Sequence, residues 1–280
     1  MDEDNLLVST KWLKNHLEAP DIKILDASWY LPKENRKPEI EFDNCHIPGA
    51  MFFDIDEVCD LDSDLPHMLP SPEKFASRVK ALGIGDGHRV IVYDGDGLFS
   101  AARAWWMFRV FGFADIAVLD GGLPKWKEEG FQVSNRTKSI QNYHFTARKN
   151  SLMISNLKDV LEASLKGTAQ IIDARAPERF LGTAPEPRPG LQSGHIPGAI
   201  NICFSELLNE DRTLKANLDL KNIFDSSGID LDKAIITSCG SGVTAAILNL
   251  ALEKLGAKKV SLYDGSWCEW GSKKNLDVEK

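Results

Sequence analysis

The chain has 280 residues, of which 43% are hydrophobic, and a formal charge of −8 at neutral pH. This length is more than one hydrophobic core usually holds, so it favours two domains. An acidic chain without a block of Lys and Arg residues lacks the basic face that a phosphate backbone requires, which argues against nucleic acid as a partner.

The start of the chain and its cysteines indicate a compartment. The sequence MDEDNLL at 1–7 is acidic and has neither the basic start nor the apolar region of a signal peptide, and no stretch is long enough to cross a bilayer. The five cysteines are odd in number and widely spaced, which suits free thiols in a reducing environment better than disulfides or a zinc site. These features predict a cytoplasmic protein that binds no membrane.

Strands alternate with helices in the first half of the chain. An apolar strand is expected at 22–26, ending in Asp26, and the block HIPGA follows from His46. The stretch PEKFASRVKAL at 72–82 predicts a helix, and the run VIVYD, ending in Asp94, predicts the next strand. This alternation is typical of parallel strands joined by crossover helices, with functional sites beyond the carboxyl ends of the strands.

The second half repeats the first. AQIIDARAP carries Asp173 where the first copy has Asp26, and a second HIPGA block begins at His195. KAIITSCGSG at 233–242 matches HRVIVYDGDG at 88–97, and VSLYDGSWCEW matches AVLDGGLPKW. Four blocks in the same order at a nearly constant offset indicate a duplicated domain.

The duplication predicts an α/β chain of two tandem domains, each a mainly parallel sheet flanked by helices. A polar stretch without periodicity separates the copies. We therefore expect an N-terminal domain at 1–135, a linker at 136–152 and a C-terminal domain at 153–280.

The two copies differ at one chemically important position. In the first copy the residue at this position is Asp94, at the end of the run VIVYD. In the second copy the matching residue is Cys239. Gly240 and Gly242 allow successive N–H groups to turn toward one point, and a helix expected from near Thr244 adds the positive end of its dipole. Such a loop favours a thiolate. The alternative is a small buried hydrophobic residue, a common role for a lone cysteine.

These blocks resemble those of the two-domain rhodanese-type sulfurtransferases, and CGSGVTA is similar to the active-site loop of the 3-mercaptopyruvate sulfurtransferases. The resemblance implies two rhodanese-like domains, the first without the catalytic cysteine, an active site between the domains and a persulfide on Cys239. It implies sulfur transfer from 3-mercaptopyruvate, with release of pyruvate, to a thiol acceptor such as thioredoxin or to cyanide. No metal cluster or cofactor fingerprint stands in the sequence, so neither metal nor cofactor is expected.

The same resemblance suggests how the donor is bound. Rhodaneses that favour thiosulfate carry basic residues after the cysteine, whereas this chain has Gly240 and Ser241. Arg179 and Arg188 resemble the family's substrate-binding pair, and guanidinium groups suit a keto-carboxylate. Taken alone, the two arginines could equally be solvated or paired with nearby glutamates. The developing enolate would be stabilised by loop N–H groups. These belong to Gly240, Gly242, Val243 and Thr244.

Ser241, His67 and Asp56 match positions at which the family has a proposed proton-handling set. Their convergence requires tertiary geometry that a sequence does not contain. The alternative is that His67 caps local structure and that Ser241 is present for its small size.

Two alternative functions are a thiosulfate:cyanide sulfurtransferase and a non-catalytic persulfide carrier or redox module. A cysteine phosphatase needs an arginine at the sixth position after its nucleophile, where this chain has Ala245. That function is therefore excluded.

Overall fold

The computed structural model describes residues 6–137 and 139–280, so most of the acidic start considered above lies outside the described residues. The chain separates into two compact units, each of which is described by itself. The first contains Met1–Leu61, Leu69–Asn150 and Asn209–Leu214, and the second contains Asp62–Met68, Ser151–Leu208 and Lys215–Lys280. The domain limits predicted from the sequence remain a prediction. Among the described helices, none is long and apolar enough to cross a membrane.

The first unit is built on a five-stranded sheet in the order β1-β5-β4-β2-β3, and all of its strand pairs are parallel. Its strands are β1 (Leu7–Val8), β2 (Ile22–Asp26), β3 (Ala50–Phe52), β4 (Arg89–Tyr93) and β5 (Ile116–Leu119). Its helices are α1 (Thr10–His16), α2 (Pro38–Asn44), α3 (Pro72–Ala81), α4 (Ala101–Val110) and α5 (Gly122–Glu128), with a 3₁₀ turn at Pro32–Glu34. Ser9 and Ser71 cap the starts of α1 and α3 through their side chains.

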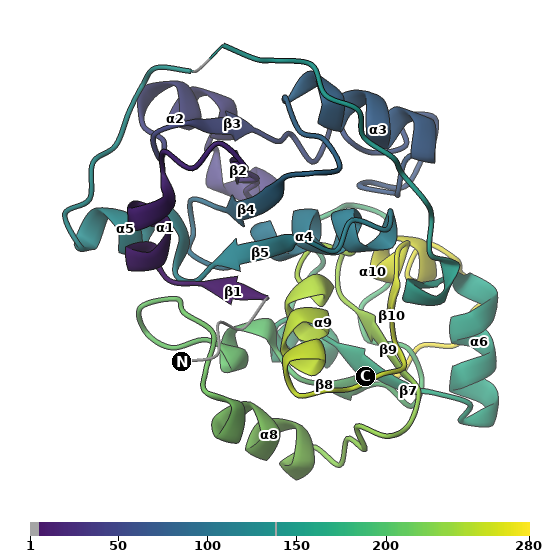
Figure 1. Ribbon diagram of the computed structural model, residues 1–280. Coiled ribbons are helices and arrows are strands. Elements are labelled where there is room, and N and C mark those ends of the chain that lie inside the picture. Colours follow the sequence, from purple (N-terminus) through teal and green to yellow (C-terminus); the bar gives the residue numbers. More distant parts are fainter. Residues whose placement is uncertain (1–5, 138) are drawn as a thin grey trace. The chain divides into compact units, whose positions relative to one another are not determined.

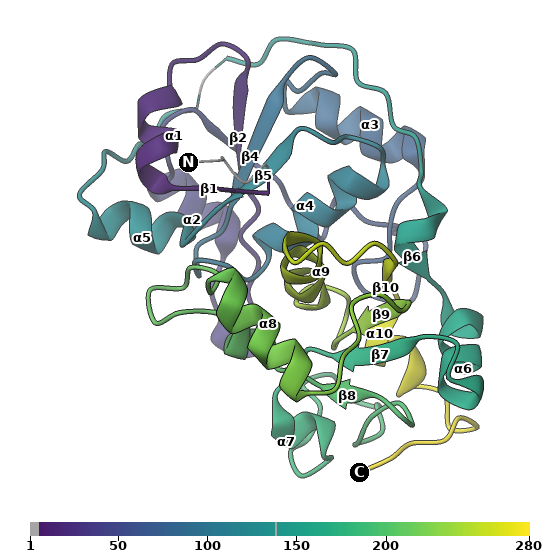
Figure 2. The same cartoon turned by 60° about the horizontal axis from the view of Figure 1, so that its bottom comes forward.

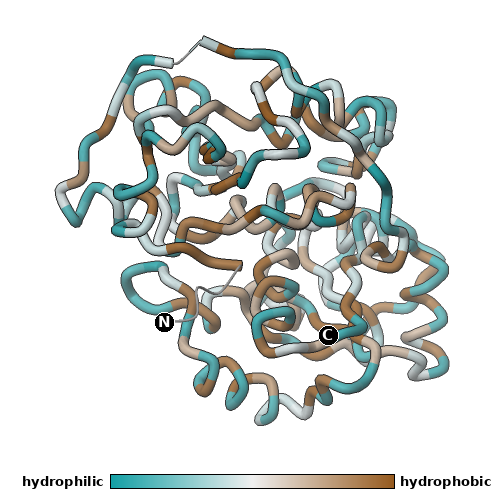
Figure 3. Tube along the Cα trace, viewed as in Figure 1, coloured by the Kyte–Doolittle hydropathy of each residue, from teal (hydrophilic) through white to brown (hydrophobic). Residues whose placement is uncertain are grey.

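Helices cover both faces of this sheet. Figures 1 and 2 show α1, α2 and α5 on one face and α3 and α4 on the other. Because successive side chains of a strand point to opposite faces, a sheet that is covered on both sides needs apolar residues at every position. Strand β4 meets this requirement, since Val90 through Tyr93 are all fully buried. Figure 3 shows the same property as hydrophobic colouring along β1 and β5.

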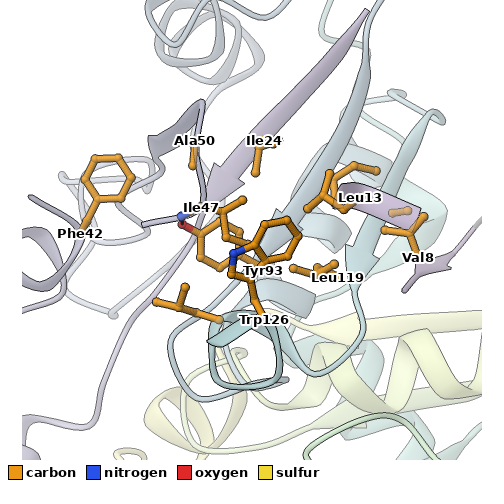
Figure 4. Packing of buried hydrophobic residues seen from close by; sticks show 12 residues of the cluster. Val8, Leu13, Ile24, Phe42, Ile47, Ala50, Tyr93, Leu119 and Trp126 are labelled. Carbon is orange, nitrogen blue, oxygen red and sulfur yellow. Dashed lines mark hydrogen bonds between the residues drawn. The ribbon is translucent and has the colours of Figure 1, made fainter. Parts of the chain in front are cut away.

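The core under α1, α2 and α5 is centred on Tyr93 and Trp126. Figure 4 shows these rings packed with Ile47, Ile24 and Leu119. The Tyr93 hydroxyl accepts a hydrogen bond from the Ile47 backbone N–H at 3.2 Å. This bond satisfies a polar group inside the core and ties the HIPGA block to the centre of the sheet.

The second unit repeats the topology of the first, with five parallel strands in the order β6-β10-β9-β7-β8. Its strands are β6 (Ile154–Ser155), β7 (Gln170–Asp173), β8 (Ile200–Asn201), β9 (Ile235–Ser238) and β10 (Val260–Tyr263). Its helices are α6 (Leu157–Lys166), α7 (Pro177–Phe180), α8 (Asn217–Ser226), α9 (Ala245–Lys254) and α10 (Ser266–Trp270), with 3₁₀ turns at Ser151–Met153 and Phe204–Leu207. The predicted duplication and the predicted parallel α/β fold are confirmed.

The two HIPGA histidines make matching contacts in the two units. The His46 ring stacks on Phe42 and its Nδ1 bonds to the Phe42 carbonyl at 2.7 Å. The His195 ring stacks on Phe180 and its Nδ1 bonds to the Phe180 carbonyl at 2.8 Å. Both rings are held by backbone oxygens, which is the structural role expected of residues that occur in both copies.

Candidate active site

Cys239 follows the last residue of β9, at the carboxyl edge of the second sheet, and is 2% exposed. Its N–H donates to the Ser266 hydroxyl at 3.2 Å, and its carbonyl accepts from the Trp267 N–H at 3.0 Å. Ser266 is fully buried and has a φ of 48°, a conformation that favours glycine. The loop that carries Cys239 is therefore anchored on the first turn of α10, which lies beside β10 in Figure 1.

The matching loop of the first unit shows what this backbone geometry binds. There the carboxylate of Asp94 accepts four hydrogen bonds of 2.8 to 2.9 Å, donated by the N–H groups of Asp96, Gly97, Phe99 and Ala101. Even with these donors, complete burial raises the pKa of Asp94 above its ordinary value. In this loop the N–H groups point at the side chain with which the loop begins. The matching position in the second unit is Cys239.

Arg179 lies against the Cys239 loop. A Cβ atom placed on Gly240 would stand 3.0 Å from the Arg179 Nη2 atom, so the guanidinium occupies the space that a side chain at position 240 would need. Its Nη2 and Nε donate to the Glu186 carboxylate at 2.5 and 3.2 Å. The alternative considered from the sequence, pairing with a glutamate, is thus present at Arg179, and its role in binding the donor stays a prediction.

Arg175 also binds Glu186, the partner of Arg179. Its guanidinium is fully buried and donates to both Asp173 and Glu186, at 2.7 and 2.8 Å in the two ion pairs. It also donates to the Gly194 carbonyl at 2.8 Å and lies over the Trp267 ring, 4.3 Å from its centroid. Glu186 is shared by two arginines, which fixes the position of the guanidinium beside the loop.

Arg188, the second predicted substrate-binding arginine, is half-buried in the loop after α7. Its positive charge lowers the pKa of the Cys268 thiol, while burial raises the pKa of that thiol more strongly. Arg179 acts on the same thiol in the same direction. The electrostatic influence of both arginines therefore converges on one place beside the Cys239 loop.

The structure brings His67 and Ser241 together. His67 is 4% exposed, and its Nδ1 lies 3.0 Å from the Ser241 hydroxyl and 3.3 Å from the Ser241 carbonyl. A neutral ring with a proton on Nδ1 would donate to both oxygens. Asp56 belongs to the first unit, where its carboxylate accepts from the Trp29 indole N–H at 3.1 Å. The three-residue relay stays a prediction.

The remaining loop residues form the turn into α9. Gly242 has a φ of 78°, which a side chain would disfavour, and Val243 is buried. Thr244 is the residue before the helix, whose first turn is closed by bonds from Ala246 and Ile247 to the carbonyls of Val243 and Thr244. Within residues 6–137 and 139–280, no group of three or more His, Cys, Asp or Glu side chains is arranged to hold a metal ion.

Comparison with known proteins agrees with this geometry. The rhodanese-like domain family matches residues 9–129 and 156–273, which together span most of the chain and place one match on each sheet. The chain belongs to the rhodanese-like family.

Two curated relatives and one crystal structure illustrate the similarity. The chain is 46% identical to a 3-mercaptopyruvate sulfurtransferase of Escherichia coli over 273 residues, which covers 97% of both chains. It is 45% identical over 294 residues to the mitochondrial thiosulfate/3-mercaptopyruvate sulfurtransferase 1 of Arabidopsis thaliana, covering 98% of this chain and 78% of that one. A crystal structure of a 3-mercaptopyruvate sulfotransferase from Escherichia coli superposes with a TM-score of 0.86 at 44% identity, covering 93% and 98% of the two chains.

Three contributors to this rhodanese site were not found from the sequence. Ser266 bonds to the Cys239 N–H, Arg175 holds Glu186 in place, and the Cys268 backbone bonds to the loop at Gly240. Ser266 lies 27 positions from Cys239, and Arg175 lies 11 positions from Glu186. The sequence places Glu186 near Arg179 and Arg188, which suggested an ion pair. It did not indicate that this ion pair positions Arg179 beside the Cys239 loop.

The close approach at Gly240 yields a prediction. Replacing Gly240 with alanine should push the Arg179 guanidinium away by a few tenths of an ångström, because a Cβ contact of 3.0 Å is shorter than ordinary packing allows. We expect kcat/KM for the sulfur donor to fall by about tenfold. A Gly87→Ala variant is the matched control, since a Cβ there meets nothing within 4 Å. Equal kcat/KM values in the two variants would show that the position of Arg179 does not affect the reaction with the sulfur donor.

Proposed function

We propose that the chain is a sulfurtransferase that takes sulfur from 3-mercaptopyruvate onto Cys239 and passes it to a thiol or to cyanide. The observation that carries the proposal is the uncharged loop at positions 240 and 241 with the Arg179 guanidinium beside it. A dianion such as thiosulfate would find no cationic side chain at those two positions. A keto acid with a single carboxylate would find the positive charge of the Arg179 guanidinium beside the loop, where the bonds to Glu186 use its Nε and Nη2 atoms.

In the proposed first step the Cys239 thiolate attacks the donor sulfur, and the carbon–sulfur bond breaks. The electron pair leaves with the carbon as the enolate of pyruvate, so negative charge develops on the departing organic fragment. Arg179 and Arg188 would hold its carboxylate, and the loop N–H groups of Gly240 through Thr244 would stabilise the sulfur and the enolate. The four N–H bonds to Asp94 in the matching loop support this use of the backbone.

A proton must then reach the enolate carbon to give pyruvate. We assign this step to Ser241, whose hydroxyl lies 3.0 Å from the His67 Nδ1 atom. Asp56 is proposed as the third member on the family resemblance alone. The persulfide that remains on Cys239 passes its outer sulfur to an acceptor by attack of a thiolate or cyanide at that sulfur.

The acceptor and the compartment are part of the proposal. A thiol acceptor such as thioredoxin, or cyanide, fits a persulfide that must be attacked by a small or protruding nucleophile. All five cysteines are free thiols, which supports activity in a reducing compartment such as the cytoplasm.

The names of the relatives support sulfur transfer more strongly than they support one donor. The Arabidopsis relative is named for both thiosulfate and 3-mercaptopyruvate, at nearly the same identity as the Escherichia coli enzyme named for 3-mercaptopyruvate alone. The choice of donor therefore rests on the loop. Whole-chain identity does not separate the two activities.

Steady-state pyruvate formation from 3-mercaptopyruvate tests the proposal, with cyanide or a dithiol as acceptor. We expect kcat/KM for 3-mercaptopyruvate to exceed that for thiosulfate by at least about 100-fold, because a lost charge-assisted contact is worth a few kcal/mol. A preference for thiosulfate would assign the chain to the other donor. Pyruvate formation no faster than without protein would leave a non-catalytic persulfide carrier as the better account.

Replacing Arg188 with alanine tests the second arginine. If Arg188 holds the carboxylate in both the bound donor and the transition state, KM for 3-mercaptopyruvate should rise by about 10- to 100-fold with a smaller change in kcat. Initial rates over a range of donor concentrations measure both constants, and Lys166→Ala, a change on an exposed helix surface, serves as the control. An unchanged KM would remove Arg188 from the donor site.

A further inference from the structure

A second buried thiol lies beside the Cys239 loop. Cys268, in α10, is 5% exposed, and its N–H donates to the Gly240 carbonyl at 2.9 Å. The preceding N–H, of Trp267, donates to the Cys239 carbonyl at 3.0 Å. These two consecutive hydrogen bonds hold residues 267–268 alongside residues 239–240. The two cysteines thus belong to adjacent backbone segments within one compact unit.

The charges that act on Cys268 are those of the Cys239 site. Burial raises the pKa of the Cys268 thiol most strongly, the Arg188 charge lowers it, and the nearby Cys239 raises it. Glu186 and Arg179 contribute to the same balance. The Cys268 thiol is therefore close enough to the Cys239 site for these charges to act on it.

We propose that Cys268 is an internal acceptor that attacks the Cys239 persulfide, forming a Cys239–Cys268 disulfide and releasing the outer sulfur as hydrosulfide. The inference rests on the proposed function, since it requires the persulfide that the donor step creates. It adds an activity, the release of sulfide without any external acceptor.

The step balances without an oxidant. The Cys268 sulfur bonds to the Cys239 Sγ atom, and the bond between Sγ and the outer sulfur breaks with its electron pair on the outer sulfur. The proton of the Cys268 thiol passes to that departing sulfur, which leaves as HS⁻. One sulfur–sulfur bond is exchanged for another. The oxidised sulfur of the Cys239 persulfide therefore remains in the protein as the Cys239–Cys268 disulfide.

The backbone arrangement brings the two segments into contact. A disulfide requires Cα atoms within about 7 Å of each other, and the bonds from the Trp267 N–H to the Cys239 carbonyl and from the Cys268 N–H to the Gly240 carbonyl hold the two cysteine-bearing segments side by side. The product has a second consequence, because a protein with Cys239 in a disulfide cannot accept sulfur again. Turnover without an external acceptor should therefore depend on a dithiol reductant that reopens the disulfide.

Cys203 provides the contrast within the same unit. It is also buried, at 6% exposure, but its Sγ lies 3.2 Å from the Ser205 hydroxyl and its N–H bonds to the Glu206 carboxylate. Its contacts belong to the 3₁₀ turn at Phe204–Leu207. A Cys203→Ser variant removes a buried thiol whose hydrogen bonds lie within this turn, so it is the matched control for Cys268→Ser.

A single-turnover experiment without acceptor tests the proposal. The reduced protein, freed of small thiols and kept under anaerobic conditions, receives one equivalent of 3-mercaptopyruvate. Pyruvate and sulfide are then measured together. After alkylation and non-reducing tryptic digestion, mass spectrometry follows the peptides 234–254 and 260–273, which contain Cys239 and Cys268 respectively.

In the wild-type protein and in Cys203→Ser we expect close to one sulfide for each pyruvate, with the two peptides joined by a disulfide. In Cys268→Ser, and in Cys268→Ala as a second variant, the ratio of sulfide to pyruvate should fall by at least about tenfold, and peptide 234–254 should carry one additional sulfur atom. Wild-type protein that releases pyruvate, keeps the additional sulfur on peptide 234–254 and shows no joined peptides would overturn the internal acceptor while leaving the proposed function intact. Absence of pyruvate from the wild-type protein would overturn both.

Discussion

Replacing Cys239 with serine should abolish the release of pyruvate from 3-mercaptopyruvate, lowering kcat/KM by about 10⁴-fold or more. Attack on the donor sulfur requires a nucleophile that is ionised and polarisable, and a serine hydroxyl at neutral pH is neither. An oxygen at this position also cannot carry a persulfide. The substitution changes one buried atom, at a residue that is 2% exposed, so the fold around the loop should be preserved.

Pyruvate formation under saturating donor and acceptor measures the effect of this change. Cys203→Ser is again the matched control, because it makes the same substitution at another buried cysteine of the second unit. Mass spectrometry after donor treatment should find the additional sulfur on peptide 234–254 of the wild type and not of Cys239→Ser. Activity of the variant above a hundredth of the wild-type value would mean that Cys239 is not the nucleophile.

Replacing Arg175 with methionine should lower the free energy of unfolding of the second unit by about 3–5 kcal/mol. The Arg175 side chain is completely buried, and it donates to the carboxylates of Asp173 and Glu186, whose side chains are 1% and 2% exposed. Methionine keeps most of the volume but leaves one buried carboxylate without its principal partner and the other with Arg179 alone. An uncompensated buried charge accounts for the large expected effect.

Urea unfolding followed by tryptophan fluorescence measures this loss. Two of the seven tryptophans, Trp267 and Trp270, lie in the second unit, and the Arg175 guanidinium lies over the Trp267 ring. Lys166→Ala is the control. The Lys166–Glu162 ion pair joins two exposed side chains at i and i+4, and its loss should cost no more than about 0.5 kcal/mol. A loss below about 1 kcal/mol for Arg175→Met would show that the buried carboxylates are protonated or hydrated in its absence.

The fold followed from the sequence because its strongest signals are local and occur twice. The apolar runs that end in Asp26 and Asp173 form equivalent interior strands, β2 and β7, in sheets of the same strand order. Burial on both faces requires continuous apolar strands, and such strands can be recognised without knowing what packs on them. The helix predicted after the Cys239 loop begins at Ala245, next to the expected Thr244.

The candidate site could be predicted only in part. Cys239 and its glycines stand together in the chain, so their chemistry could be seen locally. The pairing of His67 with Ser241 spans 174 positions and came from a family resemblance, and nothing in the residues themselves places that ring beside that hydroxyl. Ser266 gave no signal at all, because its importance lies in one hydrogen bond to the Cys239 N–H and in a backbone conformation unusual for serine.

The sequence by itself determined the duplicated parallel sheets and the single thiol at the end of one of them, since hydrophobic periodicity, repeated blocks and a glycine-rich turn are properties of neighbouring residues. Only the tertiary structure decided what surrounds that thiol. Glu186 is held between Arg175 and Arg179, and Cys268 is fastened beside Gly240 by a backbone hydrogen bond. The positions of these groups depend on how distant segments pack against each other, and packing follows from the whole of the core, which no local pattern encodes.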